Sequence, residues 1–229
     1  PIDTLSPRLR LKDSYDQIFA ATEDVKNVMD GIESKVFGIG LESYTVGSHE
    51  FCMGYVMSKH SDHIMLTLDS GHYHPTEVVS AKLGSVYAFA DHCLLHVSRP
   101  VRWDSDHVVC YDDELKAIMD ELVRLGKLGD TYIATDYFDA SINRVAAWII
   151  GLRNARKAML ASLLTPVDEL KKYEAEGDNT SRLAVSQLYK TLPVGAVWDY
   201  YCSTKKAGVG REWLDDVKKY EKEVLSLRK

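Results

Sequence analysis

Short apolar runs alternate with helix-like segments along the first part of the chain. Residues 64–68 and 93–97 are short apolar runs. The first leads directly into Asp69, which predicts a strand over residues 64–69 that ends in an acid. We expect the second to be a strand buried on both faces. A third run, residues 132–136, also ends in an acid, and a shorter strand is expected within residues 25–35. Residues 36–40 are apolar and rich in glycine, which favours an extended segment or a loop.

Apolar positions at helical spacing lie between and beyond these runs. Leu115, Ile118, Met119 and Leu122 are one such face. Helices are predicted over residues 7–22, 49–58 with Ser48 as a cap, 78–87, 112–127 and 143–164. The chain thus repeats strand and helix four times, which predicts an α/β fold with parallel strands and right-handed crossovers.

The pattern changes after Pro166. Charged and aromatic helical segments follow over residues 167–176, 181–189, 194–201 and 211–227, with a turn at 177–180 and a glycine break at 208–210. This part has no cluster of catalytic residue types. Its aromatic residues indicate packing against the rest of the fold or against another subunit: Trp198, Tyr200, Tyr201, Trp213 and Tyr220.

Each predicted strand ends near an acid or a histidine: Glu33, Asp69, His96 and Asp136. An α/β barrel places its chemistry at the carboxyl ends of its strands. A single such residue is equally well explained as a cap of the following helix. Four in succession, with more ligand-type residues in the loops, favour a functional site.

The richest stretch follows the strand at residues 64–69. After Asp69 the chain breaks at Gly71, which we expect to let the backbone turn, and then presents His72 and His74. A second ligand-rich loop, residues 103–107, supplies Asp104 and Asp106. All eight histidines lie between His49 and His107, so they are concentrated around these two loops. We predict that the loops converge on one divalent-metal site.

Oxygen-rich sites with one or two imidazoles suit Mn²⁺, Mg²⁺ or Co²⁺ and accept Zn²⁺. The candidate ligands outnumber those that one ion needs and fit a pair of ions: Glu33, Asp69, His72, His96, Asp104, Asp106 and Asp136. Lys35 lies two residues after Glu33, so in an extended segment both side chains face the same side. A lysine there can polarise a substrate oxygen.

Composition narrows the class of partner. The net charge of -6 argues against nucleic acid or an anionic membrane as the main partner. No apolar run reaches the ~18 residues of a membrane helix, and the first residues lack the apolar core of a secretory signal. The scattered cysteines, without a CxxC pair, predict reduced, buried thiols and a cytoplasmic protein: Cys52, Cys93, Cys110 and Cys202.

The ordered motifs Glu33-x-Lys35, Asp69-x-x-His72, His96, Asp104-x-Asp106 and Asp136 resemble the two-metal pattern of xylose-isomerase-like sugar isomerases. Longer strings, at residues 37–40, 42–51, 68–78, 95–107 and 136–144, resemble the L-rhamnose isomerase family specifically. A metal phosphoesterase or endonuclease on the same scaffold would need a basic rim, whereas Arg99 and Arg102 are the only basic residues of the key loop.

The resemblance implies a (β/α)₈ TIM barrel with a C-terminal helical extension, assembled as a homotetramer and dependent on manganese or a similar metal. It implies interconversion of L-rhamnose and L-rhamnulose, with two metals fixing O1 and O2 while hydrogen moves between C1 and C2, by a hydride shift or through an enediol. One metal would be held by Glu33, Asp69, His96 and Asp136, and the other by His72, Asp104 and Asp106. Lys35, Asp104 and Asp136 would be catalytic, and Lys35, His72 and His74 would contact the sugar.

The chain matches only the later part of the family's sequences. We therefore expect residues 1–165 to form the C-terminal half of the barrel with the metal site, and residues 166–229 to form the helical extension for packing or oligomerisation. Its partners would be the missing N-terminal half or other subunits, besides the sugar. The alternative function is a catalytically incomplete metal-binding or assembly fragment.

Overall fold

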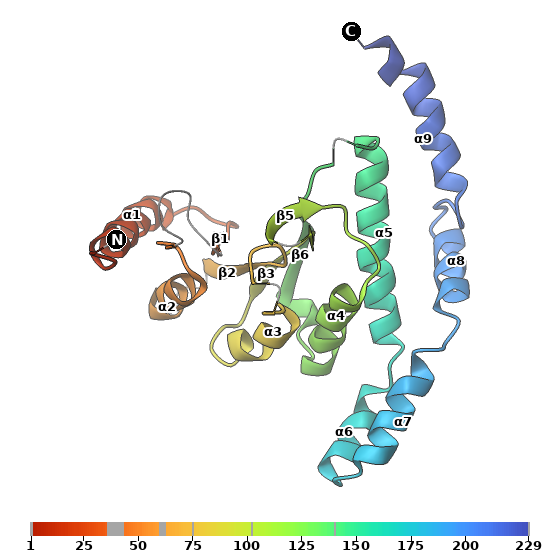
Figure 1. Ribbon diagram of the computed structural model, residues 1–229, viewed down its shortest axis with the longest axis horizontal. Helices are drawn as coiled ribbons and strands as arrows, with labels where there is room; N and C mark the ends of the chain where they lie inside the picture. Colours follow the sequence, from red (N-terminus) through yellow and green to blue (C-terminus); the bar gives the residue numbers. More distant parts are fainter. Residues whose placement is uncertain are drawn as a thin grey trace. The chain divides into compact units, whose positions relative to one another are not determined.

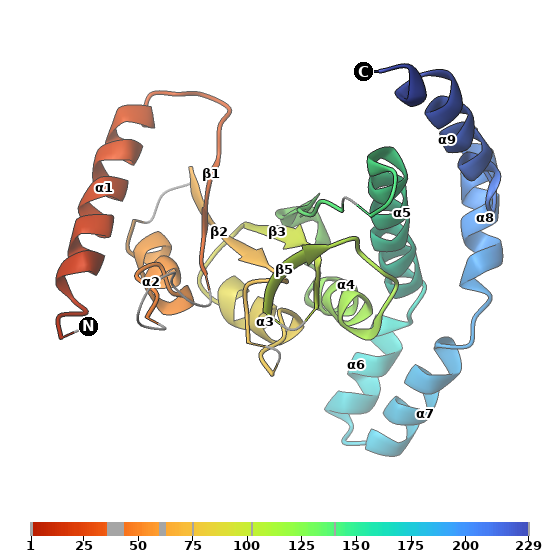
Figure 2. The ribbon, with the colours of Figure 1, turned by 45° about the horizontal axis from the view of Figure 1, so that its top comes forward.

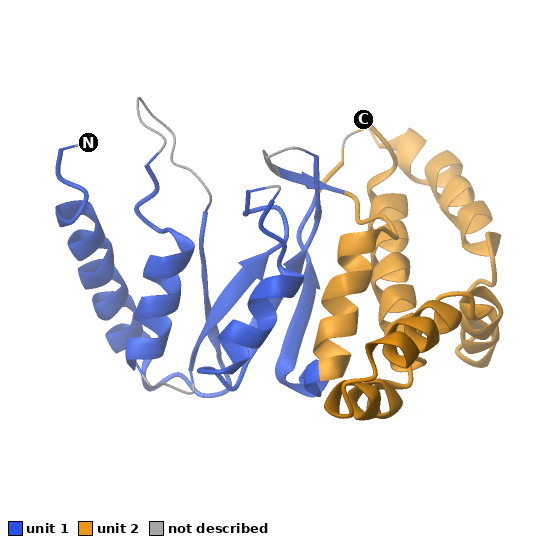
Figure 3. Ribbon diagram, turned by 60° about the horizontal axis from the view of Figure 1, so that its bottom comes forward, with its two compact units in different colours: residues 1–107, 125–137 blue, residues 108–124, 138–229 orange. Residues whose placement is uncertain are grey.

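The computed structural model describes residues 2–35, 44–59, 63–74, 76–101, 103–139 and 141–228; the side chains of Trp103 and Asp104 are outside this description. The expected extended or loop segment at 36–40 is also outside the described residues. The chain divides into two compact units, residues 1–107 with 125–137, and residues 108–124 with 138–229 (Figure 3). No helix in the described ranges is long and apolar enough to cross a membrane.

The first unit contains a four-stranded parallel sheet (Figure 1). Its strands are β1 (Asp30–Glu33), β2 (Ile64–Asp69), β3 (Cys93–Val97) and β6 (Thr131–Thr135), paired in that order. The order of the strands in space follows their order in the sequence, and helices separate them along the chain. The predicted α/β class and the four parallel strands are therefore confirmed.

The two faces of this sheet differ in burial. Register partners share a face, and Leu66, Leu68 and Leu95 on one face are at most 1% exposed. The other face is partly exposed at Leu94 and His96 of β3, whereas Thr67 and Asp69 of β2 are buried there. The prediction that residues 93–97 are buried on both faces was therefore wrong, because alternate side chains of β3 point to a face that the described residues leave partly open.

Helices α1 (Ser6–Thr22), α2 (His49–Lys59) and α3 (Ser80–Tyr87) belong to the same unit, and Figure 2 shows α1 beside α2. Asp16 links α1 to α2, because its carboxylate accepts a hydrogen bond from the Tyr55 hydroxyl at 2.9 Å and pairs with Lys59. The Tyr15 ring lies 5.2 Å from the Tyr55 ring, centroid to centroid, so apolar and polar contacts act together here.

The chain after β3 forms a hairpin and not the expected loop. β4 (Arg99–Val101) and β5 (Trp103–His107) pair antiparallel, with Arg99 opposite His107. Ser105 stabilises the hairpin, because its hydroxyl accepts a hydrogen bond from the Val101 amide at 2.8 Å.

The second unit is helical. It contains most of α4 (Asp113–Leu125), then α5 (Arg144–Leu163), α6 (Val167–Ala175), α7 (Asn179–Tyr189), α8 (Val194–Thr204) and α9 (Glu212–Glu223); the short 3₁₀ helices are Leu128–Asp130, in the first unit, and Leu225–Leu227. The four predicted apolar positions of α4 are buried. Within this unit, α5 contacts α8, and α6 contacts α7 (Figure 1).

Side-chain caps fix two of these helices. Asn143 accepts a hydrogen bond from the Ala146 amide and begins α5 where the sequence predicts. Asp178 accepts one from the Ser181 amide at 2.9 Å, so α7 begins at Asn179, two residues earlier than predicted. Among the aromatic residues of this unit, Trp198 is buried, whereas Tyr200 is 73% exposed.

The four cysteines are free thiols. Cys52, Cys93 and Cys202 are buried, as the sequence predicts, and burial raises the pKa of Cys93 to about 12. Cys110 is exposed, because it lies in the connection between β5 and α4, so the prediction of burial was wrong for this residue.

Leu66→Ala tests the core of the sheet. Leu66 is fully buried in β2, so its truncation should lower the free energy of unfolding by about 2–5 kcal/mol in urea denaturation. Leu9→Ala, at a position that is 53% exposed on α1, is the control and should change it by less than about 0.5 kcal/mol. Equal effects of the two variants would contradict the described core.

Candidate metal centre

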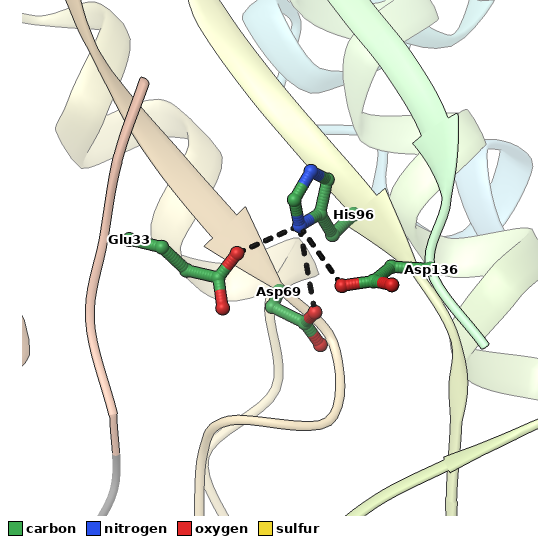
Figure 4. A group of neighbouring side chains, drawn as sticks. All are labelled: Glu33, Asp69, His96 and Asp136. Atoms are coloured by element: carbon green, nitrogen blue, oxygen red, sulfur yellow. Dashed lines mark ion pairs between the residues drawn. The ribbon is translucent and has the colours of Figure 1, made fainter. Parts of the chain in front are cut away.

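Four ligand-type side chains converge at the carboxyl ends of the four parallel strands (Figure 4). The Nδ1 atom of His96 lies 2.7 Å from Glu33 Oε2, 3.7 Å from Asp69 Oδ2 and 3.4 Å from Asp136 Oδ2. One ligand atom from each residue lies within 4.8 Å of the others. This spacing matches donor atoms around one small cation, whose bonds to oxygen are about 2.0–2.2 Å long.

The register of the sheet explains this convergence. Asp69 pairs directly with His96, so both side chains point to the same face. Glu33 pairs with Thr67, and Ala134 pairs with His96, which places Glu33 and Asp136 on that face as well, each offset by two residues. The expected clustering of the strand-end residues follows from parallel pairing alone.

A second group shares one residue with the first. Asp69, His72 and Asp106 each offer a ligand atom within 4.8 Å of the other two. His72 comes from the turn after β2, and Asp106 comes from β5 of the hairpin. Asp69 therefore belongs to both groups, and the two stretches that the sequence singles out do meet.

His72 contacts different partners through its two ring nitrogens. Nδ1 lies 2.8 Å from Glu33 Oε1 and 3.1 Å from the Ser34 carbonyl oxygen. Nε2 contacts Lys35 Nζ and lies 3.9 Å from Asp69 Oδ2. Lys35 and Glu33 both reach His72, which bears out the expectation that they face the same side. An Nδ1 proton directed at Glu33 Oε1 and the Ser34 carbonyl would leave the Nε2 lone pair, which faces Lys35, as the ligand atom of the second group.

The electrostatics of the site favour a cation. Burial raises the pKa of Asp69 to about 6. Burial also opposes ionisation of Glu33, but its hydrogen bonds and attraction to His72 and His96 outweigh this and hold its pKa at about 2. The hydrogen bond to Glu33 raises the pKa of His96. In His72, burial lowers the pKa, but hydrogen bonding to Glu33 and the charge of Asp69 raise it on balance. The carboxylates thus stabilise positive charge on the two imidazoles, and they would stabilise a cation bound between them in the same way.

The two oxygens of Asp69 have different surroundings. Oδ1 accepts hydrogen bonds from the Gly71 amide at 2.7 Å and the Ser98 hydroxyl at 3.3 Å. Oδ2 is buried and accepts no hydrogen bond within the described part of the chain. A buried carboxylate oxygen normally has a partner, and a divalent cation is a suitable one. The donor set therefore fits an oxygen-preferring divalent metal.

One predicted site residue stands apart from these groups, and another has a side chain outside the described part of the structure. His74 is exposed, and its Nδ1 lies 2.7 Å from the Thr76 hydroxyl; it belongs to neither group. The side chain of Asp104 lies outside the described residues, so its expected role as a ligand stays a prediction.

The sequence interpretation missed two residues around Asp69 and His72 and misread a third. Ser98 and Ser34 contact the ligands as described above, and an isolated serine after a strand gives no signal in the sequence. Gly71 was noticed for the wrong reason: it is not among the described glycines with positive φ, so the turn does not need its conformational freedom. It matters because a Cβ there would lie 3.0 Å from Ser98 Oγ and 3.1 Å from Asp106 Oδ1.

The fold and the site together define an α/β protein with carboxylate and histidine groups, suited to divalent metals, at the ends of its parallel strands. A sequence model of the family described as L-rhamnose isomerase (RhaA) matches residues 1–228. The chain belongs to this family.

Curated relatives agree. An L-rhamnose isomerase of Rhodopirellula baltica is 55% identical over 228 residues, which are 100% of this chain and 53% of the relative. That of Listeria innocua is 52% identical over 228 residues, 100% of this chain and 54% of the relative. That of Salmonella paratyphi B is 52% identical over 227 residues, 99% of this chain and 54% of the relative. The chain thus spans about half the length of these relatives.

Removal of single ligands tests the shared position of Asp69. We expect His96→Ala to weaken Mn²⁺ binding at one group only and Asp106→Asn at the other only, whereas Asp69→Asn should weaken binding at both. Calorimetric titration of the metal-free protein with Mn²⁺, with metal content measured after gel filtration, separates these cases. If Asp69→Asn lost no more metal than His96→Ala, the two groups would not share Asp69 as a ligand.

Proposed function

We propose that this chain is the metal-binding part of an enzyme that interconverts L-rhamnose and L-rhamnulose. The observation that supports this most directly is the pair of ligand groups sharing Asp69, in a chain of the L-rhamnose isomerase family. An aldose and its ketose differ in the positions of hydrogens on C1, C2 and their oxygens. Two adjacent cation sites suit a substrate with two adjacent oxygens.

In this proposal, one divalent metal is held by Glu33, Asp69, His96 and Asp136. The other is held by His72, Asp104 and Asp106, and Asp69 lies between the two metals. The proposed ion is Mn²⁺, and the same donors also suit Mg²⁺, Co²⁺ or Zn²⁺. When bound, such metals act as Lewis acids that fix two adjacent sugar oxygens and stabilise negative charge on them. The support for Asp104 is its Asp-x-Asp spacing with Asp106 in the extended strand β5.

Lys35 is the proposed electrostatic catalyst, because its ammonium group is a cation beside the ligand groups in the described part of the chain. Its ammonium group contacts His72 Nε2 and is therefore close to the second group. A lysine in this position donates hydrogen bonds to a sugar oxygen and stabilises the charge that develops there. Asp136, which is 54% exposed, and Asp104 are the proposed groups that accept or return a proton. His72 and His74 complete the proposed sugar contacts.

The rest of the enzyme would be supplied by further protein. We propose that residues 1–165 form the C-terminal half of a (β/α)₈ barrel and that residues 166–229 form a helical extension used in packing or in a homotetramer. The partly open sheet face supports this: Tyr132, whose side chain shares the face of His96, is 48% exposed. We place the enzyme in the cytoplasm, in keeping with its free thiols.

A second candidate is a metal-binding or assembly fragment without activity of its own. The observation that favours it is the coverage of only 53–54% of the relatives. Intact mass and a search for a co-purifying polypeptide distinguish the two. A lone 25.8 kDa chain that binds Mn²⁺ but does not turn over L-rhamnose supports the fragment.

Metal removal should switch the activity off. We expect a chelator to abolish conversion of L-rhamnose to L-rhamnulose, and added Mn²⁺ to restore it, as measured by the ketose formed. Asp104→Ala should lose most of the restored turnover. Full turnover in that variant would contradict the assignment of Asp104 to a metal.

Lys35→Met tests the proposed role of the ammonium group. It should lower kcat about 10²-fold, which is the usual cost of losing one charge-stabilising donor, while Mn²⁺ still binds at both groups. Lys172→Met is the control, since the Lys172 side chain is 71% exposed and pairs with Glu176 in α6 and its C-cap, away from the ligand groups in the sequence. If both variants kept the kcat of the parent, Lys35 would not be catalytic.

A further inference from the structure

The loops after β2 and β3 are joined at their first residues. The Ser70 hydroxyl donates to the Ser98 carbonyl oxygen at 2.8 Å, and the same hydroxyl accepts from the Ser98 amide at 2.9 Å. The Ser70 amide in turn donates to the His96 carbonyl oxygen at 3.0 Å. These reciprocal bonds fix the backbone of Ser98 relative to the end of β2.

This junction directs the Ser98 side chain at Asp69. Ser98 is 6% exposed, and its hydroxyl donates to Asp69 Oδ1 at 3.3 Å. The Gly71 amide donates to the same oxygen at 2.7 Å. Two donors therefore hold Oδ1 from two different loops, and rotation of the carboxylate would break both bonds. Held in this way, Asp69 presents its other oxygen, Oδ2, to both ligand groups.

Gly71 provides the space for this arrangement. A Cβ at position 71 would lie 3.0 Å from Ser98 Oγ, 3.1 Å from Asp106 Oδ1 and 3.2 Å from Asp69 Oδ1. These distances are shorter than normal carbon–oxygen contacts, so an added methyl group would displace one or more of the three oxygens. The missing side chain thus lets a ligand of each group and the serine donor lie close together.

We propose that Ser98 and Gly71 are positioning residues for the metal centre: they orient Asp69 so that Oδ2 is shared by the two ligand groups. Neither residue is itself a ligand. This inference rests on the proposed function, since it concerns the affinity of the proposed metal pair. Groups that hydrogen-bond to metal ligands commonly change metal affinity by about 10–100-fold when they are removed.

The test compares Ser98→Ala and Gly71→Ala with two controls in α2. Ser58→Ala removes a hydroxyl that bonds to the Tyr55 carbonyl oxygen, and Gly54→Ala adds a Cβ that meets nothing within 4 Å. Mn²⁺ is titrated calorimetrically into the metal-free protein, purified intact with any partner chain it has. The melting temperature is measured on the same samples without metal.

We expect Ser98→Ala and Gly71→Ala to weaken Mn²⁺ binding at least about 10-fold, with little change in the metal-free melting temperature of Ser98→Ala, while both controls bind like the parent.

A Kd for Ser98→Ala within about two-fold of the parent overturns the proposal. A lower melting temperature with unchanged Kd also overturns it, because it shows a purely structural role. If Gly71→Ala fails to fold, Ser98→Ala decides. A parent that binds no Mn²⁺ overturns the proposed function itself, and equal binding by parent and Ser98→Ala overturns this inference alone.

Discussion

The site depends on the way one carboxylate is held. Asp69 is the only residue that belongs to both ligand groups found among the described side chains. Its Oδ1 is fixed by two donors, whereas its Oδ2 is buried without a hydrogen bond among those residues. Burial of a carboxylate costs free energy unless a positive charge compensates it, as the raised pKa of Asp69 shows. The structure therefore buries a carboxylate at a position where a bound cation would offset the cost of its charge.

Parallel pairing then determines which residues surround Asp69. Because β1, β2, β3 and β6 run in the same direction, their carboxyl ends lie at one edge of the sheet. Paired residues on neighbouring strands share a face of the sheet, and so do residues two positions away from them along a strand. Asp69 therefore meets Glu33, His96 and Asp136 at this edge without any special local conformation. The second group needs more: His72 is held by Glu33, Lys35 and the Ser34 carbonyl, and Asp106 comes from a hairpin.

Membership of the L-rhamnose isomerase family links this site geometry to a proposed function. The chain covers only about half of its relatives, so the function of the whole enzyme cannot be assigned to this chain alone. The site groups lie in the first unit, and their spacing suits two cations. The relatives are about twice as long as this chain. The partly exposed sheet face around Tyr132 fits a fold in which more protein covers that face. Metal binding and sugar turnover are for this reason two separate proposals for this chain, and each needs its own test.

The sequence by itself predicted the four parallel strands, most of the helices and the residues of the first candidate ligand group. Strong periodicity predicted strand 64–69 and helix α4, and an acid or histidine at each strand end predicted Glu33, Asp69, His96 and Asp136 as neighbours, because parallel pairing follows from strand–helix alternation. The hairpin of β4 and β5 was not predicted, since its short strands have no apolar alternation. Only the tertiary structure decided the roles of Ser98, Ser34 and Gly71. Those roles depend on distances between loops that are far apart in the chain, such as the 3.0 Å between a Cβ at Gly71 and Ser98 Oγ, and a local pattern of residue types does not encode such distances.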